Sequence, residues 1–157
     1  MAFTPETRRI PKTTYTSIVR WLPIPTVDVV ILTPDKKKTL VGYRMNRPAQ
    51  HCWYTIGGRL QKHESIRSRA VRALREETGL TVKPAQLKLI GVLDEEFPDS
   101  AWGRMGTHCL SVYFALTISQ RPVKINSEHS KLDWLPVNSK KIHKLARTKI
   151  TNAIATL

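Results

Sequence analysis

Runs of apolar residues along the chain predict several β-strands separated by charged turns. Residues 26–33 read Thr-Val-Asp-Val-Val-Ile-Leu-Thr, a β-branched run that is typical of a buried strand. A charged turn at 34–38 is followed by a second expected strand at 39–43. Residues 86–92, 107–117 and 132–136 are also expected to form strands. The acidic stretch at 94–99 is expected to be a loop exposed to solvent, with contact to a substrate as the alternative.

Two other stretches have the apolar spacing of amphipathic helices. The first follows Ser65, a residue type favoured at N-caps, and is expected to stop at Gly79. Its apolar positions are Ile66, Ala70, Ala73 and Leu74. The second is expected to be capped by Ser139 and to turn a basic side to solvent. Its apolar positions are Ile142, Leu145, Ala146, Ile150, Ala153, Ile154 and Leu157, and its basic positions are Lys140, Lys141, Lys144, Arg147 and Lys149.

Two carboxylates and a glycine pair make the first helix a candidate for a chemical site. Glu76 and Glu77 lie in its last turn, where the helix dipole disfavours negative charge. Carboxylates gathered against that preference are typical ligands of a hard cation such as Mg²⁺. Gly57 and Gly58 precede the helix and permit a tight backbone that a ligand can approach closely.

The spacing of these residues resembles the Nudix box, which reads glycine, five residues, glutamate, seven residues, then Arg-Glu-aliphatic-any-Glu-Glu-any-Gly-aliphatic. The residues in register are Gly58, Glu64, Arg72, Leu74, Glu76, Glu77, Gly79 and Leu80. Ala73 departs from the motif, because the family has its first helical glutamate at this position. Eight matches at fixed spacing favour the Nudix motif over the simpler interpretation, an exposed charged helix without a chemical role. The resemblance implies an α/β Nudix fold, a mixed β-sheet sandwiched between α-helices, in which Glu64 and Arg72 fix the loop.

Residues 44–50, Arg-Met-Asn-Arg-Pro-Ala-Gln, resemble the GDP-mannose mannosyl hydrolase branch of the Nudix enzymes. Guanidinium groups suit phosphate oxygens, so Arg44 and Arg59 are expected to contact a diphosphate and to assist catalysis. Arg47 and Asp28 complete the expected substrate-binding set. A carboxylate inside a buried run needs a partner, and an ion pair with Asp28 is an alternative role for Arg44.

The pair Glu128-His129 lies just before the last expected strand. In the mannosyl hydrolases the matching loop carries a metal-ligating glutamine followed by a histidine that acts as general base. The resemblance therefore implies that His129 is the base and that Glu128 replaces the glutamine. It also implies Mg²⁺, with Mn²⁺ as an alternative, bound by Glu77, Glu128 and the Gly57 carbonyl, with Glu76 as a further ligand.

Composition limits the location and the partners of the protein. The chain has 157 residues, 26 basic and 12 acidic side chains and a formal net charge of +14, which favours phosphorylated substrates or nucleic acid as partners. Cys52 and Cys109 have neither metal-ligand nor disulfide spacing, which suits a reducing compartment. No apolar run is long enough to cross a bilayer, so no membrane partner is expected and the expected location is cytoplasmic.

We expect a single Nudix domain over residues 1–157, with residues 1–25 as an N-terminal extension or a segment at the sheet edge. The hypothesis is a Mg²⁺-dependent hydrolase of nucleoside diphosphate sugars, GDP-mannose-like, that releases nucleoside diphosphate and free sugar by attack at the anomeric carbon. The resemblance also implies a homodimer. One alternative is a pyrophosphohydrolase of another nucleoside diphosphate derivative or of RNA 5′ ends. Another is a non-catalytic RNA-binding protein, which Ala73 and the net charge of +14 favour.

Overall fold

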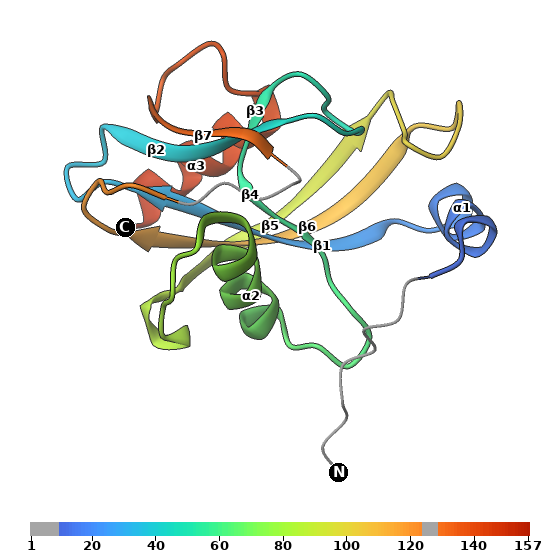
Figure 1. Ribbon diagram of the computed structural model, residues 1–157, viewed down its shortest axis with the longest axis horizontal. Coiled ribbons are helices and arrows are strands. Elements are labelled where there is room, and N and C mark those ends of the chain that lie inside the picture. Colours follow the sequence, from blue (N-terminus) through green and yellow to red (C-terminus); the bar gives the residue numbers. More distant parts are fainter. Residues whose placement is uncertain (1–9, 124–128) are drawn as a thin grey trace.

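The computed structural model describes residues 10–123 and 129–157 (Figure 1). Within these residues the elements follow in this order: α1 (Lys12–Trp21), β1 (Ile24–Leu32), β2 (Lys38–Arg44), β3 (Trp53–Tyr54), β4 (Ile56–Arg59), α2 (Ile66–Thr78), a 3₁₀ turn η1 (Pro84–Gln86), β5 (Lys88–Phe97), β6 (Thr107–Thr117), β7 (His129–Pro136) and α3 (Lys144–Thr156). None of the helices in this part of the chain is long and apolar enough to cross a membrane.

One mixed sheet forms the centre of the molecule. Five strands run in the order β3-β2-β1-β6-β5, while β4 pairs with β1 and β7 pairs with β2. The β1–β6 pair is parallel, with Val27 opposite Val112, and the other pairs are antiparallel. Parallel strands normally have both faces buried, so this pair is where helices are needed on both sides.

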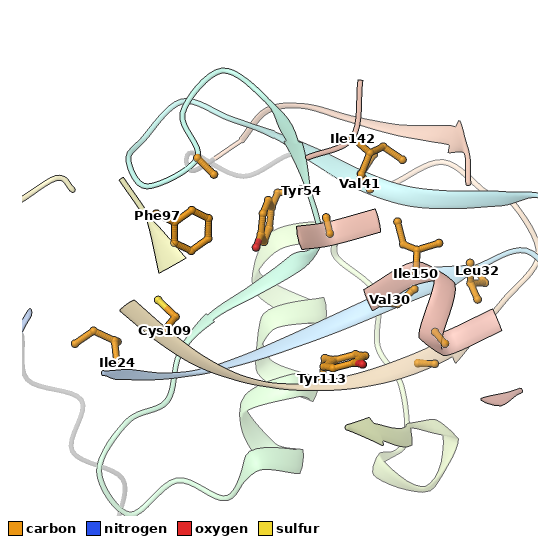
Figure 2. Packing of buried hydrophobic residues seen from close by; sticks show 14 of the residues in the cluster. Ile24, Val30, Leu32, Val41, Tyr54, Phe97, Cys109, Tyr113, Ile142 and Ile150 are labelled. Carbon is orange, nitrogen blue, oxygen red and sulfur yellow. The ribbon is translucent and has the colours of Figure 1, made fainter. Parts of the chain in front are cut away.

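Alternate residues of β1 enter two separate hydrophobic cores. Val29 and Ile31 pack in the core that contains Leu74 of α2. Val30 packs in the core on the other face, which contains Ile150 of α3 (Figure 2). Because successive side chains of a strand point to opposite faces, α2 and α3 cover opposite faces of the sheet. The expected α/β fold, with a mixed sheet between helices, is confirmed.

The expected strands at 26–33, 39–43 and 107–117 correspond to β1, β2 and β6, and the expected helix after Ser65 corresponds to α2. The Ser65 hydroxyl accepts a hydrogen bond from the Ser68 backbone N–H at 3.1 Å, which makes Ser65 the N-cap. Gly79 ends the helix in the left-handed conformation with φ of 71°. Both helix boundaries were therefore predicted correctly.

The prediction for the C-terminal helix was wrong at its start and on one face. The helix begins at Lys144 with His143 as N-cap, because Ser139 instead forms a turn in which its carbonyl accepts from Ile142 N–H at 3.2 Å. Lys149 was expected on the exposed basic side, yet it is fully buried with 0% exposure. Ion pairs with the buried side chains of Asp28 and Glu95 explain the burial of Lys149.

The expected acidic loop at 94–99 was also wrong, because β5 extends through Phe97 and places Glu95 in the buried interior. Alternation along a strand sends every second side chain inward, and Leu93, Glu95 and Phe97 share one face. The helix α1 and the short strands β3 and β4 were not expected. Strand β7 is longer than the predicted 132–136 and begins at His129.

We expect the N-cap of α3 to make the protein less stable in mild acid. The His143 Nδ1 accepts from the Leu145 backbone N–H at 3.3 Å, which requires an unprotonated nitrogen. Partial burial, with the charge of Lys144 adding to it, lowers the pKa of His143 below its ordinary value. Unfolded chains therefore take up this proton more readily, so the contribution is complete above about pH 6.5 and is lost as the pH falls through the lowered pKa.

Urea unfolding at pH 5 and pH 8 tests this prediction with His143→Asn, which keeps a capping side chain that does not titrate. The parent should lose more unfolding free energy between pH 8 and pH 5 than the variant. His51→Asn, a change at an exposed histidine, is the control and should behave like the parent. An equal loss in the parent and in His143→Asn would contradict the assignment.

Candidate functional site

A cavity of about 720 Å³ opens beside the parallel strand pair and is lined by residues from α1, β1, β4, β5 and the 44–50 segment. Arg44, Arg47 and Arg59 all line it, so the structure brings the three predicted substrate-binding arginines together. Asp28 and Glu95 also line it, and both are buried. The cavity therefore combines three guanidinium groups with two carboxylates.

Lys149 of α3 does not line the cavity but binds both carboxylates. Its Nζ lies 2.7 Å from Glu95 Oε1 and contacts Asp28 Oδ2 directly. Burial alone would lower the pKa of Lys149, but the two carboxylates raise it above its ordinary value, so the amine stays charged. A single cation thus lies against two buried carboxyl groups.

Neighbouring hydroxyl groups complete this buried network. The Tyr54 hydroxyl donates to Glu95 Oε1 at 2.6 Å, and the Thr55 hydroxyl donates to Asp28 Oδ2 at 3.0 Å. Burial and the nearby Glu95 charge raise the pKa of Tyr54, so the phenol stays neutral and donates. Burial and the adjacent Asp28 also raise the pKa of Glu95, although Lys149 opposes that rise.

The arginines are held without using Asp28 as a partner. Arg44 Nε donates to the Pro48 carbonyl at 3.0 Å, and its guanidinium lies 5.7 Å from the Tyr54 ring centroid. The alternative that Arg44 serves to pair with Asp28 is therefore wrong, because Lys149 and Thr55 bind that carboxylate.

The helix α1 supplies an aromatic wall of the cavity. Tyr15 and Trp102 both line it, and their rings meet edge to face with centroids 4.9 Å apart. The Arg59 guanidinium lies 5.6 Å from the Tyr15 ring centroid, a cation–π distance. Helix α1 is thus part of the cavity wall, and its Tyr15 also positions Arg59.

The glycine pair lies where backbone and charged side chains approach closely. A Cβ at Gly57 would lie 2.1 Å from Asp28 Oδ1 and 2.4 Å from the Val27 carbonyl. A Cβ at Gly58 would lie 2.6 Å from Arg69 Nη2. A Cβ at Gly57 would overlap backbone atoms as well as a side chain, so the close approach there requires glycine, whereas a Cβ at Gly58 would require the Arg69 guanidinium to move.

Arg72 binds two of the glutamates of the motif. Its Nε and Nη2 bind the two oxygens of Glu64 at 2.7 and 2.9 Å, and its Nη1 binds Glu76 at 3.1 Å. Glu64 Oε2 also accepts from the Gln61 backbone N–H at 3.1 Å, which ties the loop to the helix as expected. Burial would raise the pKa of Glu64, but the hydrogen bonds from Arg72 lower it below its usual value.

The predicted metal ligands do not form a carboxylate cluster in the described residues. Glu77 is 3% exposed, and its Oε1 lies 4.0 Å from Arg69 Nη2. Ala73 is buried in the core and supplies no ligand. No three His, Cys, Asp or Glu side chains gather in residues 10–123 and 131–157, and both Glu128 and the side chain of His129 lie outside these described ranges. As these residues stand, they do not fit a metal site built from several carboxylates.

The two remaining predicted residues border this region. The backbone of His129 begins β7 and pairs with Arg44 of β2, so it lies at the strand end that borders the cavity. Gly57 lines the same cavity. Glu76 and Glu77 lie on α2 and are not among the residues that line it.

The sequence reasoning missed four residues of this region, namely Glu95, Tyr54, Lys149 and Arg69. Glu95 had a signal in the alternation with Phe97, and Lys149 had one in its helical spacing from Ala146. In both cases the charged side chain was expected at the surface, although its spacing along the strand or helix predicted a buried position.

A family model described as the NUDIX domain matches residues 22–153. The chain therefore belongs to the Nudix family. It is 29% identical over 127 residues to the low-salt glycan biosynthesis protein Agl8 of Haloferax volcanii, covering 80% of this chain and 79% of that protein. It is 31% identical over 111 residues to the uncharacterized Nudix hydrolase YvcI of Bacillus subtilis, covering 69% of this chain and 63% of that protein.

Solved structures agree on the fold. The NUDIX domain of NrtR from Shewanella oneidensis, in a cocrystal structure with ADP ribose, matches with a TM-score of 0.70 at 19% identity, covering 94% of this chain and 99% of that chain. At that identity the likeness concerns the fold alone.

We expect loss of Lys149 to destabilise the protein strongly. Lys149→Met keeps much of the side-chain volume but leaves two buried carboxylates without their cation. Breaking a buried pair in this way typically costs about 3–5 kcal/mol of unfolding free energy. Denaturant unfolding of Lys149→Met against the parent measures the loss.

Lys144→Met is the matched control, because Lys144 is exposed on the same helix. Its effect should stay within about 0.5 kcal/mol. The double variant Lys149→Met, Glu95→Gln removes one of the uncompensated charges and should recover part of the loss. Equal effects of the two single methionine variants would contradict the role of Lys149.

Proposed function

We propose that this Nudix protein is a hydrolase of nucleoside diphosphate sugars, GDP-mannose-like, that releases nucleoside diphosphate and free sugar. The observation that carries the proposal is the convergence of Arg44, Arg47 and Arg59 on one cavity that Asp28 and Glu95 also line. Guanidinium groups suit a diphosphate, and carboxylates suit the hydroxyl donors of a sugar. A cavity of about 720 Å³ is within the usual range for sites of small ligands.

The relatives support a sugar-related substrate. Agl8 is named as a glycan biosynthesis protein, and its 29% identity extends over 80% of this chain. The motif at 44–50 that resembles the mannosyl hydrolases supplies Arg44 and Arg47, which line the cavity. Sequence resemblance and cavity chemistry thus favour the same class of substrate.

The proposed reaction is attack of water on the anomeric carbon. His129 removes the proton of the water, while the bond between C1 and the bridging oxygen breaks and the nucleoside diphosphate leaves. Arg44 and Arg59 stabilise the negative charge that develops on the leaving diphosphate. Asp28 and Glu95 orient the sugar by accepting hydrogen bonds from its hydroxyl groups.

Nudix hydrolases generally use divalent metals such as Mg²⁺ or Mn²⁺, which supply positive charge to a diphosphate. The requirement for Mg²⁺ in this chain stays a prediction. Arg72 binds Glu64 and Glu76, and Arg69 lies 4.0 Å from Glu77, so arginines already engage the carboxylates of the motif. The homodimer, the cytoplasmic location and the single Nudix domain over residues 1–157 also stay predictions.

Cleavage at phosphorus is the second candidate reaction. It is favoured by the adjacent Glu76 and Glu77, which the motif of ordinary pyrophosphate-cleaving Nudix enzymes contains. This reaction would use the same arginines but would yield nucleoside monophosphate and sugar phosphate.

We expect GDP-mannose incubated with Mg²⁺ in ¹⁸O-labelled water to give unlabelled GDP and sugar labelled at C1. Carbon attack transfers the oxygen of water to the sugar, whereas phosphorus attack transfers it to a phosphate. Mass spectrometry of promptly quenched products distinguishes the two, since free sugar slowly exchanges its C1 oxygen. Formation of GMP and mannose 1-phosphate would refute carbon attack and favour the second reaction.

Absence of products from a broad panel of nucleotide sugars would instead favour the RNA-binding alternative that the +14 charge suggests. Affinity for RNA should then fall steeply as the salt concentration rises, because binding releases counterions.

We further expect His129→Gln to lower kcat by about 10²–10⁴-fold, the usual effect of losing a positioned general base. In the parent, kcat should rise with pH over the range in which a histidine base loses its proton. His63→Gln is the control, since His63 is exposed and lies outside the cavity lining. An unchanged kcat at saturating substrate would remove His129 from the reaction.

A further inference from the structure

Arg69 of α2 is a buried cation at the point where the motif predicts a metal ion. It is 6% exposed, and its Nη2 lies 4.0 Å from Glu77 Oε1. The same nitrogen lies 2.6 Å from the position that a Cβ of Gly58 would take. The guanidinium therefore stands between Glu77 and the glycine pair, two of the places from which metal ligands were predicted.

The guanidinium is held firmly at one nitrogen only. Arg69 Nε donates to the Arg59 carbonyl at 3.0 Å, which joins α2 to the end of β4. Arg69 Nη1 is buried and has no hydrogen-bond partner among the described residues. A buried cation with an unsatisfied donor is costly, so its retention calls for a specific role.

Ala73 lies one helical turn after Arg69 and changes the charge of the same region. The family motif has a glutamate at this position, whereas here a methyl group packs in the core with Ala70 and Leu74. The region thus lacks one carboxylate of the motif and contains the buried guanidinium of Arg69. Both features make the surroundings of Glu77 more positive and therefore less attractive to a divalent cation.

We propose that Arg69 is a built-in cation that takes the place of a divalent metal ion between Glu77 and the glycine pair. The guanidinium neutralises Glu77, and metal binding at this carboxylate is weak as long as Arg69 is present. Positive charge between α2 and the Gly57-Gly58 pair of β4 then comes from the chain itself. The proposal rests on this geometry and on family membership, and it does not depend on which substrate is cleaved.

Titration with Mn²⁺, followed by the electron paramagnetic resonance signal of the free ion, tests the proposal without any substrate. Arg69→Ala should bind Mn²⁺ at least about tenfold more tightly than the parent, because a positive charge about 4 Å from the ligand is removed. The gain should disappear in the double variant Arg69→Ala, Glu77→Gln, which would locate the ion at Glu77.

Arg75→Ala is the matched control, since Arg75 is exposed on the same helix and its loss changes the net charge equally. It should leave Mn²⁺ affinity within about twofold of the parent, as expected for a screened surface charge. Folding of every variant is checked by circular dichroism. If Arg69→Ala does not fold, Arg69→Gln keeps a hydrogen-bond donor for the Arg59 carbonyl without the charge, and the same gain is expected.

Unchanged or weaker Mn²⁺ binding in the folded Arg69 variant would overturn the proposal, and Arg69 would then serve only to brace the loop through the Arg59 carbonyl. A gain that survives Glu77→Gln would also overturn it, because the ion would then lie elsewhere. Neither result bears on the proposed nucleotide-sugar hydrolysis, which the analysis of reaction products tests separately.

Discussion

The buried contact of Lys149 with Asp28 and Glu95 is the interaction on which the rest of the site depends. It joins α3 to β1 and β5, three elements that are far apart in the sequence, at the inner end of the cavity. Two carboxylates cannot both stay charged in a dry interior without a compensating cation. Lys149 supplies that cation from outside the cavity lining, which leaves the carboxylates themselves in contact with the cavity.

This arrangement separates two kinds of chemistry within one cavity. The guanidinium groups of Arg44, Arg47 and Arg59 come from the ends of strands and from the 44–50 segment, whereas the two acidic side chains are buried and come from β1 and β5. A substrate with an anionic half and a hydroxyl-rich half matches such a division, and a nucleoside diphosphate sugar is a substrate of that kind. The net charge of +14 adds a long-range attraction for anions but does not distinguish one from another.

Helix α2, which contains most of the Nudix motif, shows that the charge around Glu77 is not set by the motif residues alone. Glu64 and Glu76 both bind Arg72, and Glu77 faces Arg69. Arg72 belongs to the family motif, but Arg69 and Ala73 are features of this chain. Matching the motif therefore identified the family and the fold, while the charge around Glu77 depended on residues between the motif positions.

The sequence by itself determined the local structure of β1 and α2, because the signals involved are local. The cap at Ser65, the stop at Gly79 and the β-branched run of β1 act within a few residues of their own positions. The spacing from Gly58 to Leu80 likewise predicted the family, which the match to residues 22–153 confirms.

Only the tertiary structure decided which charges are buried and which of them meet. Lys149 and Glu95 looked like solvated charges because each lies in a basic or acidic stretch, yet helical and strand periodicity point both inward to the same place. No local rule connects positions 28, 95 and 149, since their contact requires the sheet and α3 to be assembled first. The burial of a charge is stable only when its partner arrives with it, and that partner is fixed by packing between distant segments.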